Sequence, residues 1–284
     1  MVPDDFECAA RLMKERSGLV LTRDRGYLLE SRLMPVVRQH NLKSFHKLVE
    51  ALRAGDAALQ SSAVDAMMAK DTAFFRDWKP FVHFAKIVLP NILAARRERK
   101  TFRVLCAGVS TGQEVYSVAM SIRDAAAQFS GWRAEIVGVD LSPTAIAAAT
   151  NAHYGQFDVQ RGLPIKALLR NFIKDDAGWR LKSDVRDMVT FQIWSLLADI
   201  YPLGRFDVIL CRNVMVYLDL QAKIDLLQKI GRALADDGVL YIGLREPLTG
   251  ISAAFRAVNR VLGIYAAHRS DKVLLSSLAV PQKR

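Results

Sequence analysis

The stretch Val104-Leu-Cys-Ala-Gly-Val-Ser-Thr-Gly-Gln-Glu-Val-Tyr-Ser-Val-Ala-Met120 decides the fold, because an apolar run leads into a loop of small residues and then into apolar residues at helical spacing. Gly108 and Gly112 can adopt positive φ and allow a ligand close to the backbone. Ser110 and Thr111 stand at a helix entrance with unpaired N–H groups. The spacing matches neither the G-x-G-x-x-G dinucleotide fingerprint nor a G-x-x-x-x-G-K-[ST] phosphate loop. It predicts a strand, a turn and a helix, which either cradle a small polar ligand or form a plain turn of an α/β protein.

A second apolar run ends in a carboxylate. The segment Ala134-Glu-Ile-Val-Gly-Val-Asp140 is followed by Ser142-Pro143, which opens an alanine-rich helix. In doubly wound sheets, ligands bind at the carboxyl ends of the strands, where an acid after the second strand binds ribose hydroxyls. Asp140 therefore predicts a ribose-bearing cofactor, and the alternative is that it only caps the next helix.

Composition sets the broad class of the protein. The 284 residues are 51% hydrophobic, which is enough for a substantial core in one large or two modest domains. The chain has no apolar run of 18 residues and an acidic rather than leader-like start, so we expect a cytoplasmic protein without direct membrane insertion. Cys8, Cys106 and Cys211 are scattered, which argues for reduced thiols and against a zinc ribbon or a disulfide scaffold.

The charge is strongly positive. The net charge is +11, and residues 1–100 hold 18 Lys and Arg against 12 Asp and Glu. Such a surface attracts nucleic acid, anionic lipid or an acidic protein, or serves only solubility.

The first hundred residues show helical and no strand-like periodicity. Helices are expected at residues 5–16, 25–39, 44–54 and 57–68, separated by Gly18, Asn41 and Gly55. We therefore predict a helical domain over residues 1–78. Over residues 79–100 we expect a linker helix with a kink at Pro90.

From residue 101 onward, strands and helices alternate. Strands are expected at residues 102–107, 134–140, 206–211 and 238–243, and helices at 114–128, 143–151 and 221–235. This alternation predicts a parallel, doubly wound sheet in a domain of residues 101–284. The pattern breaks between Tyr154 and Val189, and a candidate hairpin at residues 174–182 predicts an inserted β-subdomain at about residues 155–190.

Two further blocks make the pattern specific, namely Asp71-Thr-Ala-Phe-Phe-Arg-Asp77 and Phe206-Asp-Val-Ile-Leu-Cys-Arg-Asn-Val-Met-Val-Tyr-Leu-Asp219. With the 108–116 loop, Asp140 and Gln160-Arg-Gly-Leu-Pro164, the set closely resembles the CheR family of chemotaxis receptor methyltransferases, over roughly residues 5–268. The resemblance implies a Rossmann-like S-adenosylmethionine methyltransferase sheet, an N-terminal all-α domain and a small inserted antiparallel β-subdomain. It also implies a protein-glutamate O-methyltransferase that uses S-adenosylmethionine, releases S-adenosylhomocysteine and esterifies glutamate side chains of chemoreceptors.

The resemblance also assigns site residues. Those implied to contact the cofactor are Thr72, Arg76, Gly108, Glu114, Asp140, Ser195, Leu196, Arg212 and Asn213. Arg76 and Tyr217 are implied to lie near the transferring methyl group, and no metal is implied. Arg76 suits a carboxylate through its fork of donors. Arg212 follows an apolar strand and so lies on the crevice rim, although an ion pair with a helix acid is the structural alternative. Phe74 and Phe75 are expected to pack between the domains and to position Arg76.

The implied chemistry needs no histidine. A glutamate side chain with a pKa near ~4.3 is ionised at neutral pH, so attack on a sulfonium methyl needs alignment and desolvation rather than a general base. The five histidines lie outside the motif blocks. A hydroxyl orients a carboxylate without quenching it as an ion pair would, and Tyr217 is the candidate for that role.

Two rival functions stay open. Nucleic-acid methyltransferases that act on base nitrogens usually carry Asp/Asn-Pro-Pro-Tyr, and those that act on cytosine C5 need a Pro-Cys nucleophile. Neither Pro-Pro nor Pro-Cys occurs in the chain, which disfavours this function. The second alternative is a catalytically weak relative that binds the cofactor in signalling, and it stays open because the chain departs from the family pattern at several positions. These are Lys70 and Ser195 in place of Asn, Leu244-Arg245 in place of His-Ser, and Gln113 and Val115 in place of Glu and Pro.

The partner follows from the same reasoning. In some members of the family that the chain resembles, the β-subdomain docks a receptor pentapeptide, and that mode goes with a longer, glycine-richer hairpin. The resemblance and the short turn at residues 175–178 therefore imply action that does not depend on the pentapeptide. The helix with Arg25, Arg32 and Arg38 is expected to face acidic cytoplasmic helices of chemoreceptors. We expect a monomer and no nucleic-acid partner.

Overall fold

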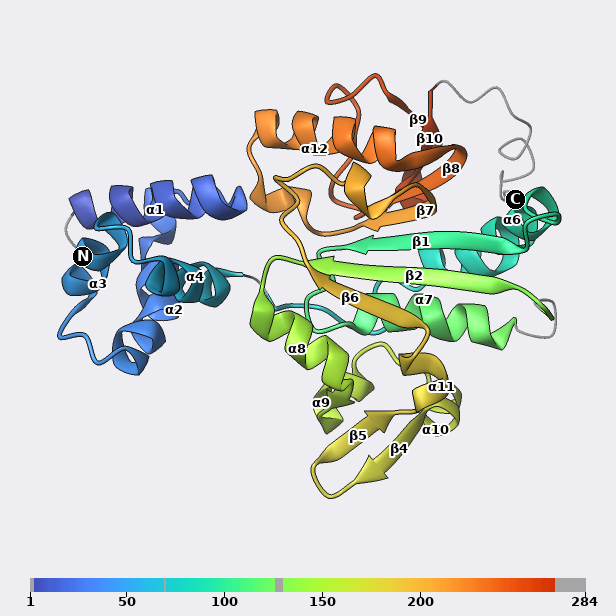
Figure 1. Ribbon diagram of the computed structural model, residues 1–284, viewed down its shortest axis with the longest axis horizontal. Helices are drawn as coiled ribbons and strands as arrows, with labels where there is room; N and C mark the ends of the chain where they lie inside the picture. The colour runs from blue at the N-terminus through green and yellow to red at the C-terminus, as the bar shows by residue number, and fades with distance from the viewer. Residues whose placement is uncertain (1–2, 69, 126–129, 269–284) are drawn as a thin grey trace.

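The computed structural model describes residues 3–68, 70–125 and 130–268 (Figure 1). Four helices form the N-terminal part, namely α1 (Pro3–Ser17), α2 (Gly26–Gln39), α3 (Phe45–Arg53) and α4 (Ala57–Met67), with the short turn η1 (Arg23–Arg25) before α2. They enclose their own apolar core, in which Leu29, Leu33 and Leu48 are fully buried. Ser44 and Asp56 cap α3 and α4 by accepting backbone N–H groups. The four predicted helices are all present.

A seven-stranded sheet forms the centre of the rest. Its order is β6 (Val189–Ile193), β2 (Arg133–Asp140), β1 (Thr101–Ala107), β7 (Phe206–Cys211), β8 (Leu234–Ile242), β10 (Ile264–Ala267) and β9 (Phe255–Asn259). The neighbouring strands β6, β2, β1, β7 and β8 run parallel, and β10 is antiparallel to both of its neighbours. The predicted doubly wound architecture is therefore confirmed. β6, β9 and β10 were not predicted; β6 and β9 are only partly buried, which leaves a weak apolar pattern.

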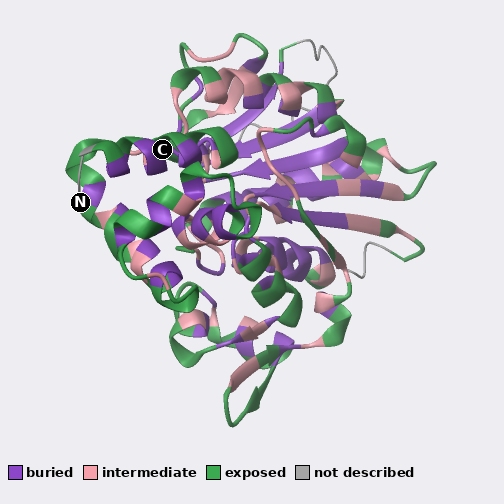
Figure 2. Ribbon diagram, turned by 60° about the vertical axis from the view of Figure 1, so that its left-hand side comes forward, coloured by how far each residue is buried: buried purple, intermediate pink, exposed green. Residues whose placement is uncertain are grey.

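Helices cover both faces of the sheet. α12 (Leu220–Ala233) packs on one face, and α7 (Gln113–Asp124) packs on the other. α8 (Pro143–Asn151) follows β2. The central strands are buried along most of their length, as Figure 2 shows. The end that the sequence predicts for α7, at residue 128, lies outside the described residues.

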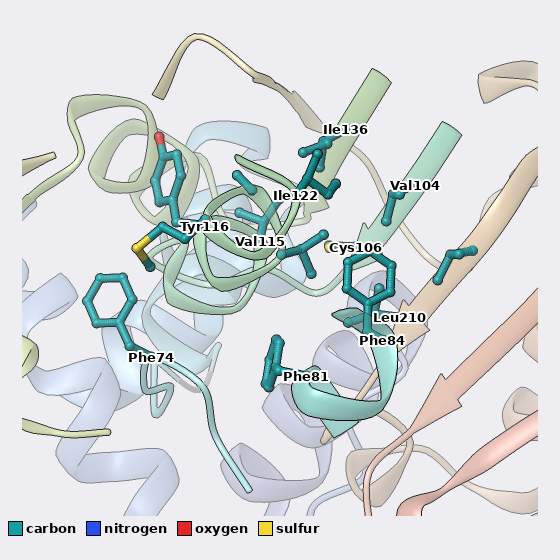
Figure 3. Close-up of a cluster of buried hydrophobic side chains, with 14 of the residues drawn as sticks. Phe74, Phe81, Phe84, Val104, Cys106, Val115, Tyr116, Ile122, Ile136 and Leu210 are labelled. Atoms are coloured by element: carbon teal, nitrogen blue, oxygen red, sulfur yellow. The ribbon is translucent and has the colours of Figure 1, made fainter. Parts of the chain in front are cut away.

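The predicted linker helix is interrupted and shorter than expected. It consists of α5 (Lys79–His83), the π-helical turn η2 (Phe84–Val88) and α6 (Leu89–Ala95), so the prediction that it continues to Lys100 is wrong. Pro90 lies in the first turn of α6, where its missing N–H is tolerated. Phe81 and Phe84 belong to the same buried cluster as strand residues of β1 and β7 (Figure 3). The segment is thus part of the core beside the sheet.

The inserted segment forms a second, antiparallel sheet. It contains β3 (His153–Tyr154), α9 (Gln156–Gln160), α10 (Ile165–Asn171), β4 (Phe172–Asp175), β5 (Gly178–Leu181) and α11 (Ser183–Arg186), with strand order β3-β5-β4. The Asp175 carboxylate accepts the N–H groups of Ala177 and Gly178 and closes the hairpin turn. The predicted β-subdomain is confirmed, and it projects from the lower part of the molecule in Figure 1.

The N-terminal helices lie beside the carboxyl ends of β1 and β2 (Figure 1). The Val20 N–H donates to the Tyr217 carbonyl at 2.9 Å, and Lys14 pairs with Asp219 at 2.8 Å. On the other side, Thr144 donates to Asp65 at 2.7 Å. These contacts make the helical part a wall of whatever site the sheet edge holds. Among the described residues, no helix combines the length and apolarity needed to cross a bilayer.

Candidate active site

The loop between β1 and α7 is held in a conformation that small residues require. Gly108 has φ +76°, and a Cβ there would come within 2.5 Å of the Val214 side chain. Ser110 also has positive φ, and its N–H donates to Asp140 Oδ2 at 2.8 Å. The Ser110 hydroxyl is buried without a hydrogen-bond partner among the described residues. A buried polar atom without a partner is costly, so this hydroxyl points to a ligand.

Asp140 lies where the sequence predicts, at the carboxyl end of β2. Its second oxygen accepts the Ser142 N–H at 2.9 Å. α8 is capped by the Ser142 hydroxyl, which accepts the Ala145 N–H, so Asp140 is not the cap of that helix. Burial raises the pKa of Asp140, and the backbone donors at Ser142 and Ser110 oppose this shift. Each oxygen keeps a second lone pair, which a ribose hydroxyl can use.

Arg212 is the buried cation of the site. Its side chain is 0% exposed, and it pairs with Glu114 at 2.8 Å and with Asp77 at 2.6 Å. Its guanidinium also lies over the Phe81 ring, 5.5 Å from the centroid. Burial raises the pKa of Glu114, while Arg212 lowers it. The ion pair with a helix acid, left open from the sequence, is therefore present, and it fixes the segment that carries Asp77.

That segment presents Arg76. The backbone has positive φ at Phe75, Asp77 and Trp78, a conformation that persists only where the surroundings enforce it. Phe74 provides such an anchor, since its ring packs edge-on against Tyr154 and Phe172 at 5.0 and 5.6 Å. Phe74 is thus buried in the core, but its cluster holds residues of the sheet domain and the inserted subdomain and none of the helical core, so the expected packing between the domains is not observed. Figure 3 shows Phe74 in this cluster.

Arg76 itself is only loosely held. Its side chain is 25% exposed, donates to the Asp71 carbonyl at 3.1 Å and lies 3.6 Å from the Asp71 carboxylate. Arg161, from the Gln160–Pro164 block, takes that carboxylate at 2.6 Å. Arg76 therefore keeps donors for a ligand.

The structure brings all the implied site residues to two adjoining pockets at the carboxyl edge of the sheet. Thr72, Arg76, Glu114 and Arg212 line a cleft of about 380 Å³, which we call the carboxyl-edge cleft. Asp140, Ser195 and Leu196 line a pocket of about 120 Å³. Gly108, Asn213 and Tyr217 line both. A nucleoside with a charged tail fits such a divided space.

Tyr217 stands where the two pockets meet. It ends the short turn η5 (Met215–Tyr217) and is 39% exposed. Its hydroxyl has no hydrogen-bond partner in the described part of the chain, while its carbonyl is held by Val20. The hydroxyl is therefore available to a substrate.

Glu246 has a role that no local sequence pattern predicts. Its buried carboxylate accepts the N–H groups of Asn213 at 2.6 Å, Gly243 at 3.0 Å and Val216 at 3.0 Å. It thereby joins the turn after β8 to the turn after β7. Only the distant partners identify this role, although the residue itself stands in the Leu244-Arg245-Glu246 block.

The structure shows what three of the residues that depart from the family pattern contact. Lys70 donates to Thr144 at 2.6 Å, so it ties the helical part to α8. Gln113 accepts the Thr111 hydroxyl at 2.8 Å, and Val115 is fully buried in the core. Within the described residues, no three His, Cys, Asp or Glu side chains are arranged to hold a metal ion.

Comparison with known proteins agrees with this geometry. The all-alpha domain of CheR methyltransferases matches residues 4–68, and their SAM binding domain matches residues 70–263. Chemotaxis protein methyltransferase 1 of Pseudomonas aeruginosa is 33% identical over 264 residues, 92% of this chain and 96% of that protein. Chemotaxis protein methyltransferase Cher2 of Pseudomonas putida is 32% identical over 265 residues, with 92% and 96% covered. The chain therefore belongs to the CheR methyltransferase family and is an S-adenosylmethionine-dependent methyltransferase.

Proposed function

We propose that the protein transfers the methyl group of S-adenosylmethionine to glutamate side chains of chemoreceptors and gives glutamyl methyl esters. The observation that carries this proposal is the position of Arg76 and Tyr217 in the carboxyl-edge cleft, next to a pocket that ends at Asp140. An acceptor that needs no general base fits this cleft, because none of its described lining residues is a histidine and its two acids, Asp71 and Glu114, are paired with arginines.

The pocket residues fit the cofactor. The free lone pairs of Asp140 suit the ribose hydroxyls, and the buried Ser110 hydroxyl supplies a donor that lacks a partner. Gly108 allows close approach to the backbone, and Ser195 and Leu196 suit the base edge and face. When bound, S-adenosylmethionine supplies an electrophilic methyl group on sulfur.

The remaining work falls to residues of the chain. Arg76 orients the acceptor carboxylate, and its partial exposure keeps the ion pair from quenching the nucleophile. The Tyr217 hydroxyl donates a hydrogen bond to the same carboxylate. Arg212, held by Glu114 and Asp77, positions Arg76 through the backbone, because it also donates to the Arg76 carbonyl at 3.1 Å. Holding the acceptor carboxylate in line with the methyl group in this way lowers the activation free energy of the transfer, because the entropy cost of orienting the reactants is met on binding.

The proposed acceptor surface is the basic face of the helical part. Arg25 lines the carboxyl-edge cleft, and Arg38 is exposed. Arg32 differs, because it donates to the Met67 carbonyl at 2.7 Å and so holds α2 against α4. The tight turn closed by Asp175 supports action that needs no receptor pentapeptide.

The experiment is transfer of labelled methyl from S-adenosylmethionine to receptor cytoplasmic fragments, followed by mild base. We expect label in the receptor that base releases as methanol. Arg76→Ala should lower receptor labelling, and Arg133→Ala is its matched control, since Arg133 is exposed and pairs with Glu135 at the opposite end of β2. The activity of the control should equal that of the wild type. Binding of S-adenosylhomocysteine without receptor labelling would favour a signalling role, and base-stable label on DNA would favour a nucleic-acid methyltransferase.

A further inference from the structure

Two arginines at the mouth of the carboxyl-edge cleft take no part in the methyl transfer itself, although Arg25 belongs to the proposed acceptor surface. Arg25 comes from the helical part, and Arg245 comes from the turn after β8. Both are exposed, and neither side chain has a hydrogen bond or ion pair among residues 3–68, 70–125 and 130–268. Cations that converge on one cleft from two parts of the chain, without neutralising acids, favour a negatively charged ligand.

The turn that carries Arg245 is rigid. Glu246, its neighbour, holds three backbone N–H groups from two turns, and its own N–H donates to the Gly243 carbonyl at 2.9 Å. Arg245 therefore projects from a fixed base rather than from a mobile loop. A fixed base reduces the entropy that an arginine loses on binding.

Arg25 is held from the other side. It closes η1, whose neighbour Arg23 pairs with Glu7 at 2.7 Å. The preceding segment is fastened to the sheet edge by the contacts of Lys14 with Asp219 and of Val20 with Tyr217. The two arginines thus face the same cleft from walls that are joined to each other.

The acids of the cleft are already engaged. Arg212 takes Glu114 and Asp77, and Arg161 takes Asp71. The acceptor carboxylate itself is matched by Arg76 and Tyr217 in the proposed function. Arg25 and Arg245 are therefore free to bind a further negative group.

Resting on the proposed function, we propose that Arg25 and Arg245 bind a second carboxylate of the acceptor segment, beside the glutamate that is methylated. They act as specificity residues, which select clustered acids and leave the chemical step unchanged. The competing ligand is the carboxylate of the cofactor, and the test below separates the two.

The test is a double-mutant cycle between enzyme and substrate. The substrates are a receptor cytoplasmic fragment and a copy in which every acid within one helical turn of the acceptor glutamate is changed to Gln. The enzymes are the wild type, Arg25→Ala, Arg245→Ala, Arg245→Lys and the control Arg133→Ala. Both arginines are exposed, and unchanged thermal midpoints would verify that the variants fold.

On the unmodified fragment, Arg245→Ala and Arg25→Ala should each lower kcat/KM by about three- to fivefold through KM, the range for an exposed ion pair. The loss should shrink in high salt and vanish on the neutralised fragment. Arg245→Lys should retain much of the preference, and affinity for S-adenosylhomocysteine should not change.

Equal losses on both fragments would overturn the inference, and so would weaker S-adenosylhomocysteine binding, which would assign the arginines to the cofactor. Absence of base-labile label with the wild-type enzyme on either fragment is a different result, since it rejects the proposed function itself.

Discussion

The two edges of the central sheet hold arginine-lined cavities of similar size. The carboxyl-edge cleft measures about 380 Å³, and a cavity at the amino ends of β1 and β7 measures about 340 Å³. Each is lined by four arginines, namely Arg25, Arg76, Arg212 and Arg245 at the carboxyl edge, and Arg96, Arg99, Arg103 and Arg205 at the amino edge. Volume and arginine content alone therefore do not distinguish the two cavities.

At the amino edge every one of these arginines is paired. Asp207 accepts from Arg96 at 2.8 Å and from Arg99 at 2.7 Å, and Arg96 also pairs with Asp237. The remaining pairs are Arg103 with Glu135 at 2.9 Å and Arg205 with Asp236 at 2.8 Å. Hydrogen bonding to Asp237 raises the pKa of Arg96. This network holds the ends of strands together.

At the carboxyl edge the pairing is incomplete. Arg212 is paired with Glu114 and Asp77 although its Nε has no partner among the described residues, and the Arg76 side chain contacts only Asp71 there. Arg25 and Arg245 have no partner in the described residues. The difference teaches that unsatisfied charge, rather than cavity volume, distinguishes a binding site from a structural network. The following changes test this contrast.

The largest effect is expected for Arg212→Ala, because Arg212 serves both structure and site. It would leave Glu114 and Asp77 without their partner, and breaking a buried pair costs about 3–5 kcal/mol. We expect urea denaturation to show that loss and methyl transfer to disappear. Glu114→Gln, which keeps the Asp77 pair, should lose less stability. Wild-type stability in Arg212→Ala would contradict the buried role.

Arg96→Ala should affect stability alone. Its side chain is 15% exposed and bridges Asp207 to Asp237, so we expect about 2 kcal/mol of lost unfolding free energy. Methyl transfer per folded molecule should stay at the wild-type level. Arg99→Ala is the control, since Arg99 is 55% exposed and should cost less than about 1 kcal/mol. Reduced transfer by folded Arg96→Ala would refute the division between the edges.

Tyr217→Phe should affect activity alone. It removes a hydroxyl that has no partner in the described residues, so the fold should keep its thermal midpoint. Loss of one hydrogen bond to the acceptor carboxylate should lower kcat about tenfold, or ~1.4 kcal/mol. Steady-state kinetics with a receptor fragment would measure this change. An unchanged kcat would remove Tyr217 from the proposed catalytic pair.

The smallest effect expected is a pH dependence of cofactor binding. Burial raises the pKa of Asp140, and only the ionised carboxylate accepts both ribose hydroxyls. S-adenosylhomocysteine affinity should therefore fall as the pH drops through this pKa, at a higher pH than the ordinary value of ~3.9 would give. Calorimetry from neutral to mildly acidic pH would show it. Asp140→Asn should bind weakly without this dependence, and a flat wild-type profile would contradict the assignment.

Much of the site could be predicted because its residues lie next to local patterns. The apolar run before Gly108 and the carboxylate that ends β2 identify strand ends, and parallel strand ends meet at one edge. The pair between Arg212 and Glu114 was foreseeable as an alternative, since a cation follows one strand and an acid opens a helix after another.

The rest depends on contacts between distant parts of the chain. Asp207 meets Arg96 across 111 positions, and Glu246 meets Asn213 across 33, so no local pattern predicts either. The convergence of Arg25 and Arg245 depends on how the helical part docks. The edge strand β6 escaped prediction because it is only half-buried, and an edge strand needs no apolar alternation.

The most direct test of the contrast between the edges is a crystal structure with S-adenosylhomocysteine. We predict its ribose on Asp140 and its sulfur facing Arg76 and Tyr217, with the amino-edge cavity free of the ligand. Ligand in the cavity lined by Arg96, or a nucleoside bound away from Asp140, would contradict the claim that unsatisfied charge at the carboxyl edge identifies the active site.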